Sequence, residues 1–212
     1  MEQGKSGPTA ELPLPVRGPL LILISGPSGV GKDALIRLMR EGEGAGRRYV
    51  VTATTRPQRQ GEIDGVDYHF VGSMEFEAMR DRGELQEWAE VYGYYYGVPA
   101  AEVDRGFNQG RDVVIKTDVQ GAATIKQKMP HGVFIFLAPS SKEELLARLW
   151  RRSSESGDDL KRRIDTFHIE MEQLHLFDYV VVNREGCLDQ ALRQVEATIT
   201  AEKCRVVPRE VA

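Results

Sequence analysis

Short apolar runs alternate with segments of helical spacing along most of this chain. The run from Leu20 to Ser25 lies between Gly18-Pro19 and a glycine-rich turn, which is typical of a strand buried on both faces of a parallel sheet. Comparable runs occupy 112–118, 132–138 and 179–183, and each adjoins a helical segment. This alternation predicts an α/β fold with a parallel, doubly wound sheet.

Helical spacing begins directly after the glycine-rich turn. Leu35, Leu38 and Met39 recur on one face, which predicts a unit of strand, glycine loop and helix. Ser140 and Glu143 form a capping-box pattern that predicts the start of a helix through "KEELLARLWRR". The remaining helices are expected over roughly 158–176 and 187–203.

The stretch from about 50 to 100 departs from this alternation. Its segments are short, rich in Thr, Tyr and Gly, and interrupted by one small helix near "MEFEAMRDRG". We expect an insertion with its own small sheet. Insertions at the carboxyl ends of parallel strands are where ligands usually bind, so this stretch is expected to contribute to a site.

Composition narrows the functional classes. A chain of 212 residues is long enough for one α/β domain. Its 28 basic and 32 acidic residues give a slightly negative net charge, so the protein as a whole has no positive electrostatic field that would attract nucleic acid or anionic lipid. Cys187 and Cys204 are too few for a disulfide framework, which suits a reducing cytosol. Because no secretory signal or membrane span is evident, we expect a cytoplasmic protein without a membrane or nucleic-acid partner.

Residues 26–33, "GPSGVGKD", match the phosphate-binding pattern G-x-x-x-x-G-K-[ST] up to Lys32. The glycines let backbone N–H groups converge on a phosphate, and the lysine would bridge the β- and γ-phosphates. Asp33 stands where the pattern has a hydroxyl that ligates magnesium. A carboxylate is also a hard oxygen ligand, so we interpret the loop as a working variant, with a crippled site as the alternative.

The insertion contains candidates for a second phosphate site. Arg56 and Arg59 flank Pro57, and two guanidinium groups can clamp one phosphate with charge-assisted hydrogen bonds. Glu87 precedes a run of tyrosines, and a buried carboxylate can accept two parallel N–H bonds from the edge of guanine. A solvated arginine pair beside core aromatic residues is the alternative, which the proximity to a phosphate loop makes less favoured.

With these motifs in order, the chain resembles the guanylate kinase family over about residues 20–203. The matching segments are "GPSGVGK", "TTRPQRQGEIDGVDYHFV", "EWAEVYGYYYG", "DVQGA", "RLWRR…RRI" and "VVVN". The resemblance implies phosphoryl transfer from ATP to GMP, with Mg²⁺ as cofactor. It also implies a phosphate-loop core at 18–50, 102–140 and 170–207, a GMP-binding insertion at 51–101 and a helical lid at 141–169, within a single domain at 18–207. We expect tails at 1–17, predicted to be disordered, and 208–212.

The resemblance also implies roles for individual residues. The ATP site would contain Gly26, Pro27, Ser28, Gly29, Val30, Gly31, Lys32, Asp33 and, beside the adenine, Asn183. The GMP site would contain Arg56, Arg59, Tyr68 and Tyr96 at the phosphate, Thr52, Glu87 and Val98 at the guanine, and Asp118. The catalytic residues would be Lys32, Arg56 and the lid-region arginines Arg148, Arg152 and Arg163. Asp33 and Asp118 are the expected Mg²⁺ ligands, and we expect a monomer or a homodimer.

Three positions depart from the family pattern. Besides Asp33, Val98 replaces the usual Ser or Thr at the guanine, and Lys116 replaces an acidic residue two positions before Asp118. Val98 leaves only a backbone N–H for the guanine contact, so we expect weaker discrimination of guanine. The positive charge of Lys116 is expected to offset the extra negative charge of Asp33.

Two other functions stay open at this point. "GPSGVGKD" with a later "YYGV" also resembles ribose 1,5-bisphosphate phosphokinases, which act on a sugar phosphate and carry Asp at this loop position. The residues of the insertion that are expected to bind the base and the phosphate of GMP would have little purpose in an enzyme that acts on a small sugar phosphate. Non-catalytic guanylate-kinase-like binding modules are the second alternative, although such modules typically lose the phosphate loop or the lid arginines, which are retained here.

Overall fold

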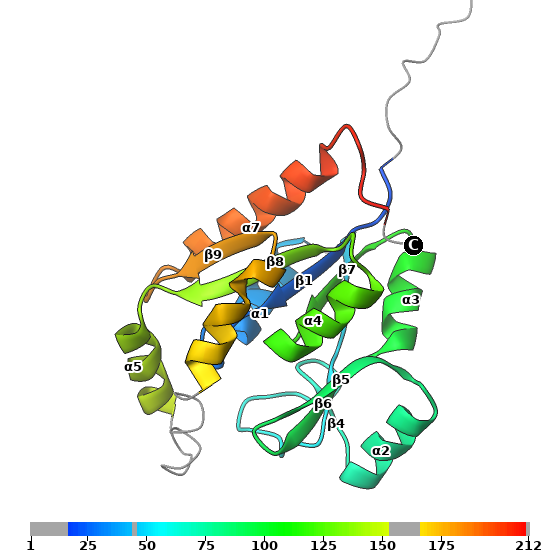
Figure 1. Cartoon of the computed structure of the whole chain (residues 1–212), viewed down its shortest axis with the longest axis vertical. Helices are drawn as coiled ribbons and strands as arrows, with labels where there is room; N and C mark the ends of the chain where they lie inside the picture. The colour runs from blue at the N-terminus through cyan, green and yellow to red at the C-terminus, as the bar shows by residue number, and fades with distance from the viewer. Residues whose placement is uncertain (1–16, 44–45, 153–165, 211–212) are drawn as a thin grey trace, which may run out of the picture.

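A computed structural model describes residues 17–43, 46–152 and 166–210 of the chain (Figure 1). Its core is a five-stranded sheet in the order β2-β7-β1-β8-β9, in which every neighbouring pair is parallel. The strands are β1 (Leu21–Ser25), β2 (Arg47–Tyr49), β7 (Asp112–Lys116), β8 (Val133–Pro139) and β9 (Tyr179–Asn183). The four apolar runs that predicted buried strands correspond to β1, β7, β8 and β9, but β9 is at the edge of the sheet and its Val180 is 53% exposed, so the prediction of burial was wrong for that strand.

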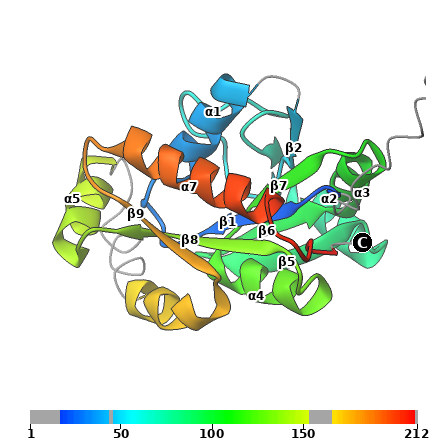
Figure 2. The same ribbon diagram turned by 90° about the horizontal axis from the view of Figure 1, so that it is seen from above.

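Helices cover both faces of this sheet. Figure 2 shows α1 (Lys32–Glu43) and α7 (Leu188–Lys203) on one side and α4 (Val119–Lys128) on the other, where α3 (Ala100–Asn108) also packs. Side chains of β1 alternate between the two layers, since Ile22 joins the first cluster and Leu23 the second. The predicted α/β fold with a doubly wound parallel sheet is confirmed.

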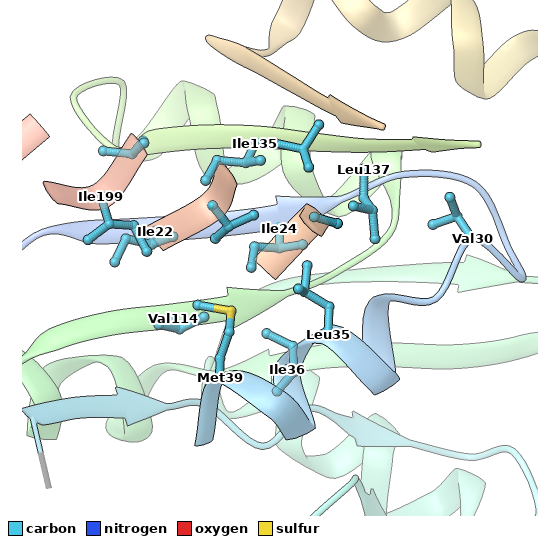
Figure 3. Close-up of a cluster of buried hydrophobic side chains, with 14 of the residues drawn as sticks. Ile22, Ile24, Val30, Leu35, Ile36, Met39, Val114, Ile135, Leu137 and Ile199 are labelled. Atoms are coloured by element: carbon cyan, nitrogen blue, oxygen red, sulfur yellow. The ribbon is translucent and has the colours of Figure 1, made fainter. Parts of the chain in front are cut away.

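One buried cluster anchors the phosphate loop to the core. Ile22, Ile24 and Leu137 from the sheet meet Leu35, Ile36 and Met39 of α1 (Figure 3). Val30 projects from the loop into the same cluster and is fully buried. The buried side chain of Val30 therefore anchors the phosphate loop to the hydrophobic core, which fixes the position of the loop backbone.

A smaller mixed sheet is formed by the stretch for which an insertion was predicted. Its order is β4-β3-β6-β5, with β3 parallel to β4 and the other pairs antiparallel. The strands are β3 (Ala53–Thr54), β4 (His69–Phe70), β5 (Leu85–Val91) and β6 (Tyr94–Pro99), and α2 (Ser73–Asp81) lies beside them (Figure 1). The domain boundaries given above stay predictions.

The helix α5 (Lys142–Arg152) begins one residue later than its capping pattern suggested. The N–H of Glu144 donates to Ser141 Oγ over 3.2 Å, and the Leu145 N–H donates to the Ser141 carbonyl. Ser141 is therefore the cap, and the prediction of Ser140 with Glu143 was wrong by one position. "SSKEE" offers two overlapping Ser-x-x-Glu patterns, and the sequence alone does not decide between them.

The predicted helix at 158–176 is only partly within the described residues. Residues 166–172 are helical, and the 3₁₀ turn η2 (Gln173–Leu176) follows. The last predicted helix, at 187–203, corresponds to α7 with Cys187 as its N-cap. Within the described ranges, no helix is long and apolar enough to cross a membrane. The cytoplasmic location and the monomer or homodimer stay predictions.

The chain contains two tryptophans, and they lie on different parts of the fold. Trp88 is on β5 of the small sheet, 42% exposed, with its ring edge against Tyr95. Trp150 is on α5 and 63% exposed.

Candidate active site

A cavity of about 510 Å³ lies at the carboxyl ends of β1 and β7, between the core and the small sheet. This volume is in the usual range for small-molecule sites. Eleven of the predicted site residues line it: Ser28, Gly29, Gly31, Lys32, Asp33, Thr52, Arg56, Arg59, Tyr68, Tyr96 and Asp118. Both predicted phosphate-binding sets therefore face the same space.

The glycines of the loop are required by its backbone. Gly26 and Gly31 have φ values of 140° and 105°, in the region that only glycine adopts readily. A Cβ atom on Gly26 would lie 2.1 Å from the carbonyl oxygen of Leu137. On Gly31 it would lie 2.6 Å from Asn183 Nδ2. The loop thus passes directly against the neighbouring strands.

We expect Gly26→Ala to lower the free energy of unfolding by more than about 3 kcal/mol, because backbone strain and a backbone clash coincide there. Gly110→Ala is the matched control, since Gly110 has a φ of 66° but no atom within 4 Å of its would-be Cβ. It should cost only about 1 kcal/mol. Urea unfolding of both variants measures the difference, and equal losses would contradict the clash argument.

Lys32 is folded back onto its own loop. Its ammonium group donates to the carbonyl oxygens of Gly26 and, over 3.1 Å, of Pro27. Burial lowers the pKa of Lys32, while Glu170, Asp33 and Asp118 act in the opposite direction. The ammonium group is thus held at the phosphate loop, where it can form a charge-assisted hydrogen bond with an anionic ligand.

Asp33 and Lys116, two of the three departures from the family pattern, are in direct contact. Lys116 Nζ lies 2.5 Å from Asp33 Oδ1, and the Tyr68 hydroxyl donates to the same oxygen over 3.3 Å. Partial burial would raise the pKa of Asp33, but the Lys116 ammonium outweighs this and lowers it to about 2. Asp33 is therefore a carboxylate throughout the physiological range.

Arg56 is the centre of the second phosphate cluster. Its guanidinium group donates to both carboxylate oxygens of Glu62, at 2.8 and 3.0 Å, and its Nε donates to the Tyr96 hydroxyl over 3.2 Å. The same guanidinium lies 5.4 Å from the centre of the Tyr68 ring. Arg59 lines the cavity beside it. Arg56 is thereby oriented toward a ligand that could replace Glu62 as its anionic partner.

Glu87 is buried behind the cavity wall, with only 2% of its surface exposed. Thr117 Oγ1 donates to one carboxylate oxygen over 3.0 Å, while Oε2 has no hydrogen-bond partner among the described residues. Gly121 makes room for this carboxylate, since a Cβ atom there would lie 2.7 Å from both oxygens. Burial, and next Asp118, raise the pKa of Glu87 to about 8.

Val98 does not line the cavity. Its side chain is fully buried and packs with Val103 and other members of the second core cluster. Thr52 does line the cavity, and its hydroxyl donates to the Lys116 carbonyl over 3.2 Å. Of the three residues predicted to read guanine, only Thr52 lines the cavity; Glu87 lies one layer behind it, bonded to the cavity-lining Thr117, and the Val98 side chain contributes only packing.

The oxygen ligands present are compatible with a magnesium ion bound mainly by phosphates. Asp118 Oδ1 caps α4 by accepting from the Gly121 N–H over 3.0 Å, and Asp33 accepts on Oδ1 alone in the hydrogen bonds described above. No group of three or more acidic, histidine or cysteine side chains in the described parts could hold a metal. Mg²⁺ characteristically takes one or two carboxylates plus substrate phosphates, so the donor set fits that mode.

Arg148 and Asn183 brace the phosphate loop from outside the main cavity. Both donate to the Val30 carbonyl, Asn183 Nδ2 over 2.7 Å and Arg148 over 3.1 Å. Arg148 also contacts Glu144, Glu185 and the Asn183 carbonyl. With Gly29 and Gly31, these two residues line a second cavity of about 330 Å³. The side chain of Arg152, and Arg163 entirely, lie outside the described residues.

Sequence reasoning missed two acidic residues of the site. Glu62 orients Arg56, although it lies in a quoted motif that could have drawn attention to it. Glu170 lines the cavity with one buried oxygen that has no hydrogen-bond partner among the described residues. Burial raises the pKa of Glu170 to about 7. No signal in a charged helical segment distinguishes Glu170 from its acidic neighbours.

The family model and the relatives named below point to one family. The family model described as guanylate kinase matches residues 19–202. The chain is 47% identical over 194 residues to a rice protein named guanylate kinase 2, chloroplastic/mitochondrial, covering 91% of this chain and 68% of that protein. It is 42% identical to the guanylate kinase of Caldanaerobacter subterraneus, covering 88% of this chain and 89% of the other. The crystal structure of guanylate kinase from Anaplasma phagocytophilum superposes with a TM-score of 0.71 at 28% identity, over 90% of this chain and 89% of the other.

Proposed function

Because the chain belongs to the guanylate kinase family, we propose that it transfers the γ-phosphoryl group of ATP to the phosphate of GMP, forming ADP and GDP. The observation that carries this proposal is the single cavity shared by Lys32 of the phosphate loop and Arg56 of the small sheet. Two phosphate-binding groups that face one space suit a reaction between two phosphorylated substrates.

In this proposal the ATP phosphates lie on residues 26–33, and the GMP phosphate lies among Arg56, Arg59, Tyr68 and Tyr96. Arg56 would exchange Glu62 for the phosphate, because a dianionic phosphate offers the guanidinium the same bidentate geometry with more charge. Asn183 and the arginines of the lid region keep the predicted roles at the adenine and the ATP phosphates.

The guanine base would bind against Glu87. Its Oε2 atom is buried and without a partner among the described residues, which is costly unless a ligand supplies a donor. Guanine offers two adjacent N–H donors on one edge, and Glu87 would accept both once its carboxyl group gives up the proton that burial retains in the free protein. Thr52 would assist from the facing wall. This pairing favours a purine acceptor over the sugar phosphate considered above.

The transfer itself needs no dedicated base, since the attacking phosphate oxygen is already anionic. Lys32 and Arg56 hold the two phosphates in line and neutralise charge that develops between them. Mg²⁺, when bound with ATP, supplies further charge neutralisation, and Asp33 and Asp118 would hold it. Closing the insertion and lid over the cavity would exclude water and limit wasteful ATP hydrolysis.

A coupled assay that offers GMP, AMP or ribose 1,5-bisphosphate to the protein with ATP and Mg²⁺ tests the proposal. We expect turnover with GMP. Turnover on the sugar phosphate alone would overturn the choice of acceptor. GMP binding without formation of GDP would instead indicate a non-catalytic binding module.

A further inference from the structure

Lys116 is a buried cation with an uncommon set of neighbours. Its side chain is 10% exposed at the end of β7 and lines the cavity between the two phosphate-binding sets. One carboxylate, Asp33, is its only ion-pair partner among the described residues, 2.5 Å away. A buried ammonium group is costly without a counter-ion, so Lys116 depends on Asp33.

Asp33 depends on Lys116 in turn. Asp33 is the last residue of the loop "GPSGVGKD" and is 44% exposed toward the cavity. Alone, its negative charge would stand beside the β- and γ-phosphates of a bound nucleotide and repel them. The adjacent ammonium cancels that charge at the position where repulsion would be strongest.

The same ammonium group contacts the second phosphate cluster. Lys116 Nζ lies 3.8 Å from the centre of the Tyr68 ring, and the Arg56 guanidinium lies 5.4 Å from the same centre. The Tyr68 hydroxyl in turn donates to Asp33. Lys116 also holds Thr52 through its backbone carbonyl. One residue thereby connects the ATP loop with the side chains proposed for GMP.

We propose that Lys116 is a positioning residue that acts as the fixed counter-ion of Asp33, so that the two residues form one charge-neutral unit that makes this loop compatible with a nucleoside di- or triphosphate. The inference rests on the proposed function for the identity of the nucleotide. It predicts that losing Lys116 alone harms nucleotide binding, whereas losing both charges does not.

The test is a double-mutant cycle of Lys116→Met and Asp33→Ser, with ADP binding measured by calorimetry in EDTA, in the absence of metal and GMP. We expect Lys116→Met to weaken ADP binding by about 10- to 100-fold, the effect of an uncompensated charge near a phosphate. Asp33→Ser should bind ADP at least as tightly as wild type. The double variant should match Asp33→Ser within about threefold, far from the product of the single effects.

Lys203→Met is the matched control, because Lys203 pairs with Asp112 over the same 2.5 Å at the opposite end of β7. It should leave ADP affinity unchanged. If Lys116→Met does not fold, Lys116→Gln removes the charge with less loss of polarity and should weaken ADP binding similarly. Strict additivity, or wild-type affinity in a folded charge-removed variant, would overturn the inference. A wild-type protein without GMP kinase activity would overturn the proposed function while leaving this binding result intact.

Discussion

Glu87→Gln is expected to lower kcat/KM for GMP by about 100-fold or more, because the new amide presents a donor to the donors of guanine. The substitution preserves the size of the side chain and its bond from Thr117. It puts an N–H donor at the buried Oε2 position and removes the ionisable carboxyl group. Steady-state kinetics with GMP as the varied substrate measures the loss.

The same variant is expected to be more stable than wild type above about pH 5. A carboxyl group with a pKa raised from 4.5 to about 8 keeps its proton in the folded chain at pH values at which the unfolded chain has lost it. Wild-type stability therefore falls as the pH rises through this window, and Gln avoids that loss. The gain should grow from under about 1 kcal/mol at pH 5 to roughly 3–4 kcal/mol at pH 8.

Glu90→Gln is the control for both measurements, since Glu90 lies on the same strand but is exposed. It should change neither GMP kinetics nor the pH dependence of unfolding. Undiminished GMP turnover in Glu87→Gln would contradict the assignment of the guanine site. A stability difference that does not change between pH 5 and pH 8 would contradict the raised pKa.

Lys32→Ala is expected to lower kcat by about 1,000-fold, the scale found when one preorganised donor to a developing charge is removed. The ammonium group is already held at the phosphate loop by the Gly26 and Pro27 carbonyls, so it needs little rearrangement to reach the transferring group. Single-turnover measurement of GDP formation isolates this step from product release.

Lys203→Ala serves as the control, because it removes a partly buried lysine whose ion pair with Asp112 lies far from the cavity. It should keep kcat within about twofold of wild type, as expected for a change remote from the site. If Lys32→Ala lost GMP or ATP affinity without any loss in the rate of the bound complex, Lys32 would be a binding residue only.

The parallel core was predictable because its strands are apolar on both faces. Leu20 to Ile24 form an uninterrupted apolar run, and their side chains join the buried clusters on the two faces of the sheet in alternation. The edge strand β2 was not predicted. Its residues Arg47 and Arg48 are polar and form ion pairs with Glu196 and Glu102 from distant segments, so no local pattern marks it as a strand.

The site was predictable where short motifs carry the chemistry. The loop, Arg56 and Tyr96 come from such motifs, and Arg56 and Tyr96 contact each other. The contact of Lys116 with Asp33 joins residues 83 positions apart, and the sequence suggested only that their charges offset one another. The sequence predicted that Val98 would offer guanine only its backbone N–H, but not that its side chain would be buried against Val103 of α3, away from the cavity.

The two tryptophans lie where their intrinsic fluorescence can report on substrate binding. Trp88 follows Glu87 on β5, so its emission should respond when a base occupies the small sheet. Trp150 lies on α5 beyond the arginine that braces the phosphate loop, so it should respond to the nucleotide on that side. With Trp150→Phe and Trp88→Phe, each half of the substrate pair could be followed by fluorescence in an unlabelled enzyme, and the order of binding could be read directly from stopped-flow traces.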